Sequence, residues 1–264
     1  MNRQHFTIDS GRYTVSLATK PTHVEEAQRL RHRVFSEAMP LQGNDLDTQL
    51  DKDPFDSFCH HLLVREKSSS QVVGTYRLLP DNTARSECGF FCETEVEASA
   101  LYCLPGKILE LGRAAVHPAH RGSGVIGLLW HGLCVYALKG DYDYFVGLCS
   151  VRKGQVTPSP ASIYRYLREN HLSPNGPLVT PHASFSFISN SDPGPTTREA
   201  LPALLKGYLR LGSELIGAPT DDGYTVSFPV LLDIKKIPSA YLRRFARYLT
   251  PAPLPMGPTF SSAA

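Results

Sequence analysis

The sequence lacks several features that would indicate a simple functional class. Lys and Arg total 27 and Asp and Glu total 25, so the formal charge of the 264 residues is only +2. This near-balance argues against a nucleic-acid-binding protein and against an acidic tail. The chain has no apolar run long enough to span a bilayer, and its first residues carry no apolar stretch typical of a signal peptide. We therefore expect a cytoplasmic protein.

Common catalytic motifs are also missing. The chain has no G-x-S-x-G nucleophile elbow and no G-x4-G-K-[ST] phosphate loop. No histidine is followed five residues later by aspartate, so the H-x4-D dyad of glycerolipid O-acyltransferases is absent. The six cysteines include no C-x-x-C pair. We therefore expect no metal site and reduced thiols.

The residues that are present are sufficient for a folded core. Hydrophobic residues make up 42% of the chain, with 12 Phe, 12 Tyr and 1 Trp. Thr22 and Glu25 form a T-x-x-E pattern typical of a capping box at the start of a helix. Periodicity and turn signals predict helices at 22–38, 125–139, 159–170, 202–217 and 241–249, and strands at 61–66, 71–80, 107–118, 141–151, 184–188 and 224–237. This order predicts an α/β sheet domain with helices on its faces.

A turn between a strand and a helix carries the strongest chemical signal. It includes Arg121, Gly122 and Gly124, and an apolar helix follows directly. Backbone N–H groups and the positive end of the helix would face any anion in this turn, commonly a phosphate. The alternative is an ordinary surface turn that happens to contain two glycines.

In context, this turn resembles motif A of the GNAT acyltransferase superfamily, which holds the phosphates of a pantetheine-bearing acyl donor. Arg121 and Gly124 match the superfamily pattern, whereas Ile126 replaces its second small residue. The replacement disfavours coenzyme A, whose pyrophosphate needs close backbone approach. It favours acyl carrier protein, which offers a single phosphodiester. Acyl-coenzyme A stays open as the alternative donor.

Other motifs narrow the resemblance to a family. The spacings Arg31-x-x-x-Phe35, Asp53-x-x-Asp56, Arg77 and Glu110-x-x-Arg113 resemble the signature of acyl-homoserine lactone synthases. Residues 22–250 resemble more closely the ornithine N-acyltransferases and related long-chain N-acyl amino acid synthases, through patterns such as DxFDxxCxHLLV and VVGTYRLL. Where that family reads G-x-x-I-C-G-E-P, this chain has ELIGAPTDDGY. The departure leaves the acceptor amino acid open.

The resemblance implies both a fold and a reaction. The fold is a single enlarged GNAT-like domain over residues 1–250, of α/β (α+β) class, with a mixed, mostly antiparallel sheet flanked by helices and a Pro-rich tail at 251–264. The reaction moves a long-chain, 3-hydroxy acyl group from acyl carrier protein to the α-amine of an amino acid, ornithine above all, without a bound cofactor. The alternative is a non-catalytic lipid- or protein-binding module on the same fold.

The implied partners are acyl carrier protein and the amino-acid substrate, with no nucleic acid. The product is a membrane lipid, so contact with the inner face of the cytoplasmic membrane is also expected. The acidic carrier should meet basic side chains, for which the candidates are Arg152, Lys153, Arg165, Arg168, Lys206 and Arg210. A C-terminal basic group faces either the carrier or anionic lipid, and comprises Lys235, Lys236, Arg243, Arg244 and Arg247.

Glu110 and Arg113 are the catalytic candidates. Acylation of an amine requires the ammonium to lose a proton, and Glu110 can accept it directly or through water. A β-bulge near Arg113 would bring the two side chains together and point backbone N–H groups at the thioester oxygen. A purely structural ion pair between Glu110 and Arg113 is the alternative.

Five further residues are candidates for binding the acceptor. Asp53 and Asp56 lie in an Asp-rich loop and can hold a cationic group, although such loops are usually solvated. Arg31 and Arg77 can form a bidentate clamp on the acceptor carboxylate or on these aspartates, with an exposed helix position as the alternative for Arg31. His61 is either a base or a hydrogen-bonded structural histidine.

Overall fold

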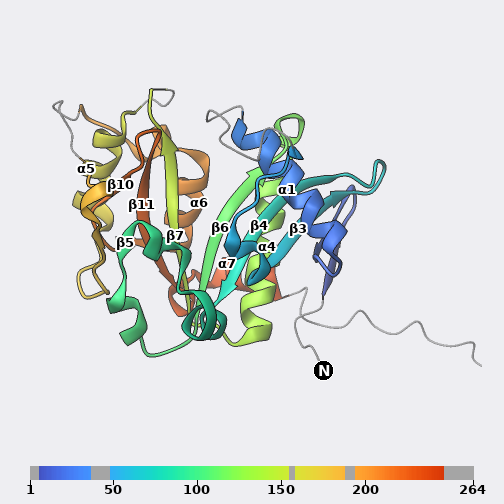
Figure 1. The fold of residues 1–264 in the computed structure, drawn as a ribbon, viewed down its shortest axis with the longest axis horizontal. Coiled ribbons are helices and arrows are strands. Elements are labelled where there is room, and N and C mark those ends of the chain that lie inside the picture. Colours follow the sequence, from blue (N-terminus) through green and yellow to red (C-terminus); the bar gives the residue numbers. More distant parts are fainter. Residues whose placement is uncertain (1–5, 37–47, 155–157, 188–193, 247–264) are drawn as a thin grey trace, which may run out of the picture.

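The computed structural model describes residues 6–36, 48–154, 158–187 and 194–246 of the chain (Figure 1). The strands of its main sheet run in the order β1-β2-β3-β4-β6-β7-β11-β10, with β9 paired to β11. Their bounds are β1 Thr7–Ser10, β2 Tyr13–Leu17, β3 His60–Glu66, β4 Val72–Pro80, β6 Ile108–Val116, β7 Tyr144–Arg152, β9 Glu214–Leu215, β10 Thr220–Asp221 and β11 Thr225–Asp233. β5 (Val96–Glu97) and β8 (Thr180–Pro181) form a separate two-stranded sheet.

Neighbouring strands of the main sheet are antiparallel, except for β6 and β7, which are parallel. The predicted mixed, mostly antiparallel sheet is therefore confirmed. The β6–β7 pairing covers only Ile108 to Glu110 against Tyr144 to Val146. Beyond these residues the two strands diverge, as Figure 1 shows at the centre of the molecule.

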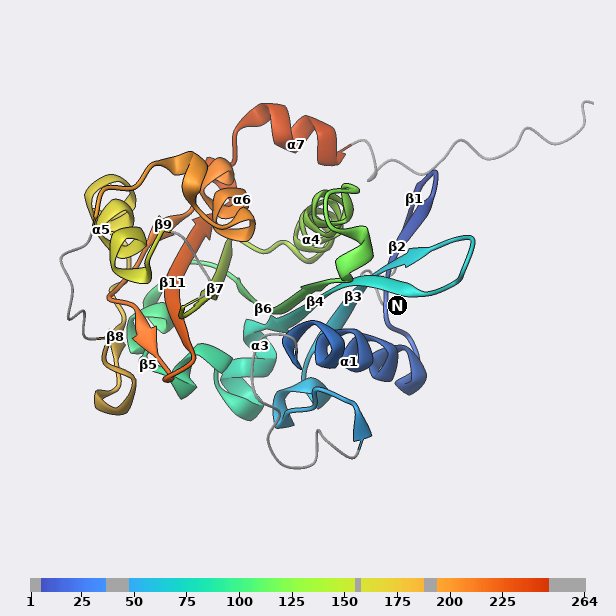
Figure 2. The same cartoon turned by 90° about the horizontal axis from the view of Figure 1, so that it is seen from above.

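Helices cover both faces of the sheet (Figure 2). Their bounds are α1 Pro21–Ser36, α3 Asp81–Thr83, α4 Val125–Gly140, α5 Pro160–His171, α6 Ala203–Leu211 and α7 Ser239–Ala246. α1 and α4 lie on opposite faces of β3, β4 and β6. Side chains alternate along β3 accordingly: Leu62 and Val64 belong to the core cluster that includes α4, and Leu63 to the cluster that includes α1.

The first part of the chain differs from the prediction in two ways. α1 begins at Pro21, with proline at the first helical position, where its missing N–H removes no helix hydrogen bond. Thr22 therefore lies inside the helix, and the predicted capping box is wrong. The hairpin of β1 and β2 was not predicted, because its strands are only four and five residues long. Helix 22–38 is confirmed to Ser36, beyond which lie undescribed residues.

The segment after β8 also differs from the prediction. The helix predicted at 202–217 ends at Leu211, because Gly212 adopts φ +95° and closes the helix in a left-handed cap. The following Glu214 and Leu215 form β9 against β11. The strand predicted at 184–188 is wrong: Ala183–Phe185 is a turn of 3-10 helix, and residue 188 lies outside the described residues. β11 ends at Asp233 and leads into a 3-10 turn at Ile234–Lys236.

Between β4 and β6, the chain forms a series of short helical turns rather than a long element. One of them, η3, is a 3-10 helix over Phe91–Thr94, with Glu95 as its C-terminal cap. A separate 3-10 turn, η1, lies before β3 and spans Pro54–Ser57. Both turns lie close to the point where β6 and β7 separate, and both contribute side chains to the site described below.

Candidate functional site

A cavity of about 270 Å³ opens where β6 separates from β7. Its walls come from β4, β6 and β7, and from Phe91 and Glu95 of the η3 turn. Three basic side chains line it, Arg77, Arg113 and Arg152, as do three acidic ones, Glu95, Glu110 and Asp222. The cavity therefore combines charges of both signs with an apolar remainder, a composition suited to an amino acid.

Glu110 is buried at this cavity and is held by backbone donors. The Phe91 N–H donates to its Oε2 at 2.6 Å, and the Cys92 N–H donates to its Oε1 at 2.7 Å. Burial raises the pKa of Glu110 to about 7, although the two N–H bonds act in the opposite direction. A pKa in this range suits a group that accepts a proton near neutral pH.

The predicted β-bulge is present, but it does not join Glu110 to Arg113. The register between β4 and β6 shifts by one residue between Gly112 and Ala115, and Arg113 takes φ +51°. This left-handed backbone is uncommon for a residue with a side chain and costs free energy. The Arg113 side chain leaves the strand toward Asp53, with Nη2 at 3.3 Å from Oδ2. The expected Glu110–Arg113 ion pair is therefore wrong.

Asp56 is the centre of a buried ion-pair network. Arg31 donates to both of its carboxylate oxygens in a fork, at 2.9 and 2.7 Å, and Gln28 donates to Oδ2 at 2.9 Å. Arg31 also bonds the Asp51 backbone oxygen. Burial alone would raise the pKa of Asp56, but the bonds from Arg31 outweigh it and hold the pKa well below its usual value. Arg31 is fully buried, so the exposed helix position considered for it is wrong.

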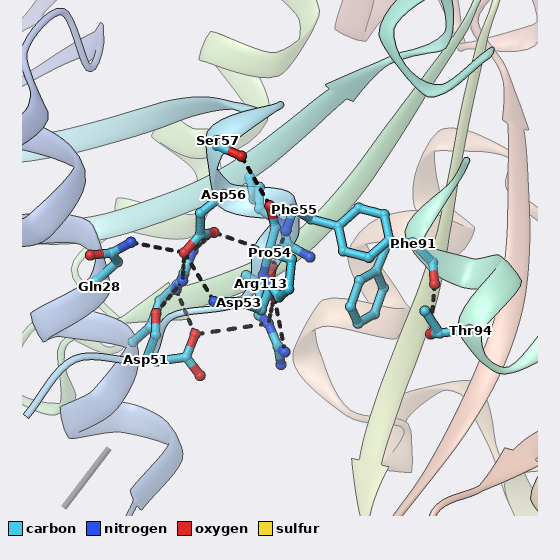
Figure 3. Close-up of polar contacts among 12 residues, drawn as sticks. Gln28, Asp51, Asp53, Pro54, Phe55, Asp56, Ser57, Phe91, Thr94 and Arg113 are labelled. Carbon is cyan, nitrogen blue, oxygen red and sulfur yellow. Dashed lines mark hydrogen bonds and ion pairs between the residues drawn. The ribbon is translucent and has the colours of Figure 1, made fainter. Parts of the chain in front are cut away.

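Arg77 and Arg113 both pair with the other aspartate of the motif, Asp53. Figure 3 shows the contact between Arg113 and Asp53. Arg77 Nη1 donates to Asp53 Oδ2 and, at 3.1 Å, to Asp56 Oδ1. The guanidinium carbons of Arg77 and Arg113 also lie 4.9 and 5.3 Å from the centre of the Phe91 ring. Asp53 and Phe91 thus hold both arginines beside the cavity.

The spacing of the two aspartates has a local cause. Asp53 is the N-terminal cap of η1, where its Oδ1 accepts the Phe55 N–H at 2.9 Å. Pro54 occupies the first helical position, and Asp56 Oδ2 reaches back to the Asp53 N–H at 3.5 Å. The pattern D-P-F-D is therefore a capping box, which turns both carboxylates toward the arginines.

His61 lies beneath the same network. Its side chain is buried, and its Nε2 lies 3.2 Å from the Asp56 backbone oxygen. Burial lowers the pKa of His61, which favours the neutral ring. This environment matches the hydrogen-bonded structural histidine, one of the two interpretations of its sequence position.

The predicted donor turn lies on the exposed surface before α4. Gly122 and Gly124 have φ angles of +81° and +88°, which only glycine adopts at low cost, and Gly124 precedes the first residue of α4. Hydrogen bonds to Tyr13 hold the turn in place, since Tyr13 OH lies 3.2 Å from Ser123 Oγ and 3.1 Å from His120 Nδ1. The turn ends at the N-terminus of α4, the end of a helix that favours an anion.

The basic residues assigned to carrier binding do not form one cluster. Arg152 lines the cavity, and Lys206 and Arg210 lie with Arg198 along a surface groove of about 490 Å³. Others are paired with acidic side chains: Lys153 with Asp221, Lys235 with Asp143 and Lys236 with Glu214. The side chain of Arg244, and all of Arg247, lie outside the described residues.

Two absences among the described residues bear on other kinds of function. These residues contain no group of three or more His, Cys, Asp or Glu side chains placed to hold a metal ion. No helix in the same part of the chain is long and apolar enough to cross a membrane.

The family model of the acetyltransferase (GNAT) domain matches residues 30–131, which include the end of α1, the η1 turn, β3, β4 and β6. The mixed sheet and this match show that the chain contains a GNAT domain. It is 34% identical over 248 residues to the L-ornithine N(alpha)-acyltransferase of Agrobacterium fabrum, covering 88% of this chain and 84% of that protein. The corresponding protein of Brucella abortus is 32% identical, with 88% of each chain covered. The chain therefore belongs to the L-ornithine N(alpha)-acyltransferase family, as its resemblance predicted.

Among solved structures, the chain is similar to FeeM, an N-acyl amino acid synthase from uncultured soil microbes. That match has 14% identity and a TM-score of 0.48, and it covers 85% of this chain and 92% of FeeM.

Sequence reasoning had identified Glu110, Arg113 and Arg77, all of which line the cavity. It had missed Glu95 and Asp222. Glu95 lies in a segment without periodicity, and Asp222 lies in the ELIGAPTDDGY segment that departs from the family pattern. That departure was the only available signal for Asp222.

Proposed function

We propose that this chain transfers a long-chain, 3-hydroxy acyl group from acyl carrier protein to the α-amine of an amino acid, most favourably ornithine. The product would be an N-acyl amino acid, a lyso-ornithine lipid when the acceptor is ornithine. The names of the curated relatives support ornithine as the acceptor. The observation that carries the proposal is the buried Glu110 carboxyl, with a pKa of about 7, at the cavity between β6 and β7.

In this reaction the acceptor nitrogen attacks the thioester carbonyl carbon. The ammonium first loses one proton to Glu110, directly or through one water. The new C–N bond then forms and the C–S bond breaks. The nitrogen releases a second proton as the amide forms, and the pantetheine sulfur, which leaves as a thiolate, takes up one proton to become a thiol. The backbone of the bulge at residues 112–114, which lines the cavity, supplies N–H groups near the developing oxyanion.

Arg77 is the residue best suited to the acceptor carboxylate. Its Nη1 is engaged by Asp53 and Asp56, but its Nη2 is buried and has no hydrogen-bond partner among the described residues. An unsatisfied buried guanidinium nitrogen is costly. A carboxylate arriving in the cavity would satisfy it, while Asp53 and Asp56 fix the orientation of the guanidinium from behind.

The donor side of the proposal rests on the turn at Arg121, Gly122 and Gly124. Ile126, in the first turn of α4, disfavours the close backbone approach of a pyrophosphate and favours the single phosphodiester of acyl carrier protein. The carrier is acidic, and the surface groove lined by Arg198, Lys206 and Arg210 offers complementary charge, with Glu199 as its one acidic lining residue among those described.

Purified protein mixed with 3-hydroxyacyl-carrier protein and ornithine should form N-acyl-ornithine, detected by mass spectrometry. The absence of any N-acyl amino acid across several chain lengths and acceptors would contradict the proposal. The same acyl group attached to coenzyme A tests the identity of the donor. If the reaction is faster with acyl-coenzyme A than with acyl carrier protein, acyl-coenzyme A is the donor.

Because the product would be a membrane lipid, we also propose that the enzyme works in the cytoplasm and contacts the inner face of the cytoplasmic membrane. Cell fractionation, with and without high salt, tests this location. Recovery of the protein exclusively in the salt-independent soluble fraction would refute membrane contact.

A further inference from the structure

The cavity contains acidic groups that the proposed chemistry does not use. Glu95 and Asp222 line it together with Glu110, although they come from segments far apart in the sequence. Transfer of an acyl group to an α-amine needs only one base, and Glu110 supplies it. The remaining two carboxylates therefore call for a role in binding.

Glu95 presents a carboxylate at the cavity wall. Its Oε2 accepts a hydrogen bond from the buried Thr220 hydroxyl, which fixes the carboxylate at the cavity wall. Burial, together with the negative charge of Asp222, raises the pKa of Glu95 above its ordinary value. A carboxylate in this environment gains more from an incoming cation than an exposed one does.

Asp222 lies at the exposed side of the same wall. Its Oδ1 accepts the N–H groups of Tyr224 and Thr225 at 2.8 and 2.6 Å, so the tight turn before β11 holds the side chain in place. Its charge acts on Glu95, because it contributes to the raised pKa of that residue. Asp222 thus adds negative potential beside Glu95.

The positive side of the cavity provides independent support for a ligand. The Arg77 side chain is only 3% exposed, and its Nη2 has no hydrogen-bond partner among the described residues. Arg77 and Gly112 both line the cavity. A side-chain Cβ at position 112 would lie 4.0 Å from Nη2, so glycine leaves this nitrogen without a side-chain neighbour on that side.

The η3 turn connects the two acidic positions. Glu110 bonds the N–H groups at the start of this turn, and Glu95 caps its end, four residues after Phe91. Both side chains line the cavity, so it presents one carboxyl group near each end of the turn. An acceptor with two amino groups can therefore meet a separate carboxyl group with each of them.

From these observations we infer that Glu95, assisted by Asp222, forms a subsite for the distal ammonium of a diamino acid acceptor. The α-amine then faces Glu110, and the carboxylate faces Arg77 Nη2. The inference rests on the proposed function and deepens it, since it identifies residues that select an acceptor with a cationic side chain. It predicts that norvaline, which is ornithine without the δ-amine, is a poorer acceptor.

The test compares ornithine and norvaline at saturating acyl donor. For the wild-type protein, we expect kcat/KM for ornithine to exceed that for norvaline by about 10- to 100-fold, the range of one charge-assisted hydrogen bond. In Glu95→Gln the ratio should fall toward one, because the amide keeps an acceptor for Thr220 but loses the charge. Asp222→Asn should lower the ratio less, since its amide oxygen can still accept the turn N–H groups.

Glu97→Gln is the matched control. Glu97 lies two residues further along the chain, is exposed and bonds Ser99, so its variant should keep the wild-type ratio. Thermal unfolding of each variant checks that the fold is intact. A wild-type ratio near one, or a ratio unchanged in both Glu95→Gln and Asp222→Asn, overturns the subsite. Failure of the wild-type protein to acylate either amino acid instead overturns the proposed function.

Discussion

Glu110 should give the reaction a defined dependence on pH. Its pKa is raised to about 7 by burial, and a general base accepts a proton only in its ionised form. The rate should therefore rise with pH and level off above about 7. Below that value kcat/KM should fall about tenfold for each pH unit, since each unit lowers the ionised fraction tenfold. An ordinary glutamate has a pKa near 4.5. With such a base, the rate would stay unchanged as the pH falls to about 5.5.

The variant Glu110→Gln tests whether this residue causes the fall in rate below pH 7, which is the acid limb of the pH profile. The amide cannot accept the proton, so kcat/KM should fall by about 100- to 10,000-fold, the usual contribution of general base catalysis. The limb near pH 7 should disappear from the residual activity. One amide N–H must also face the N–H of Phe91 or Cys92, at a cost of about 1–3 kcal/mol in stability.

The assay is the initial rate of N-acyl-ornithine formation from pH 5 to 9, with subsaturating ornithine and saturating donor. Urea unfolding at the same pH values separates a chemical defect from a loss of folded protein, and Glu97→Gln serves as the control. A wild-type limb near 4.5, or a limb near 7 that survives in Glu110→Gln, would refute the assignment of Glu110 as the base.

Three further substitutions test other parts of the structure. Asp56→Ala leaves the buried Arg31 guanidinium without its main partner and should lower the free energy of unfolding by about 3–5 kcal/mol in urea denaturation. Gly124→Ala imposes about 1–2 kcal/mol of strain at φ +88°, so KM for the acyl donor should rise in steady-state kinetics. Ser159→Ala removes the N-cap bond to Ser162 and should lower the stability by about 1 kcal/mol in thermal unfolding, with kcat unchanged. An unchanged stability of Asp56→Ala or Ser159→Ala, or an unchanged KM for the donor in Gly124→Ala, would contradict the corresponding role.

Strongly patterned elements could be predicted from the sequence, and elements that depend on tertiary pairing could not. β3, β4, β7 and α5 lie within one to three residues of their predicted bounds at either end, because their apolar periodicity and flanking turns agree. The helix at 202–217 was predicted too long since its apolar pattern continues past Gly212 into Leu215 and Ile216. Those two residues are buried by strand pairing and packing around β11, which local periodicity does not encode.

The candidate site shows the same division. Glu110 could be predicted because a carboxylate in an apolar strand needs a reason to be there. Its partners could not be predicted, since the Phe91 and Cys92 N–H groups come from an aperiodic segment that meets β6 only in the folded chain. The bulge was predicted in the right place, but its consequence was reversed: it sends Arg113 to Asp53 rather than to Glu110.

The network of Arg31, Asp56, Arg77, Asp53 and Arg113 is better explained by positioning than by stability. Buried ion pairs contribute little net stability, because desolvation offsets most of their attraction. This network nevertheless connects α1, the η1 turn, β4 and the bulge of β6 through consecutive shared carboxylates. It thereby fixes the Arg77 guanidinium at the cavity wall, and it holds Arg113 at a backbone conformation that costs free energy. An apolar replacement of the same volume could fill the space, but it could neither orient a guanidinium nor retain the strained bulge beside Glu110.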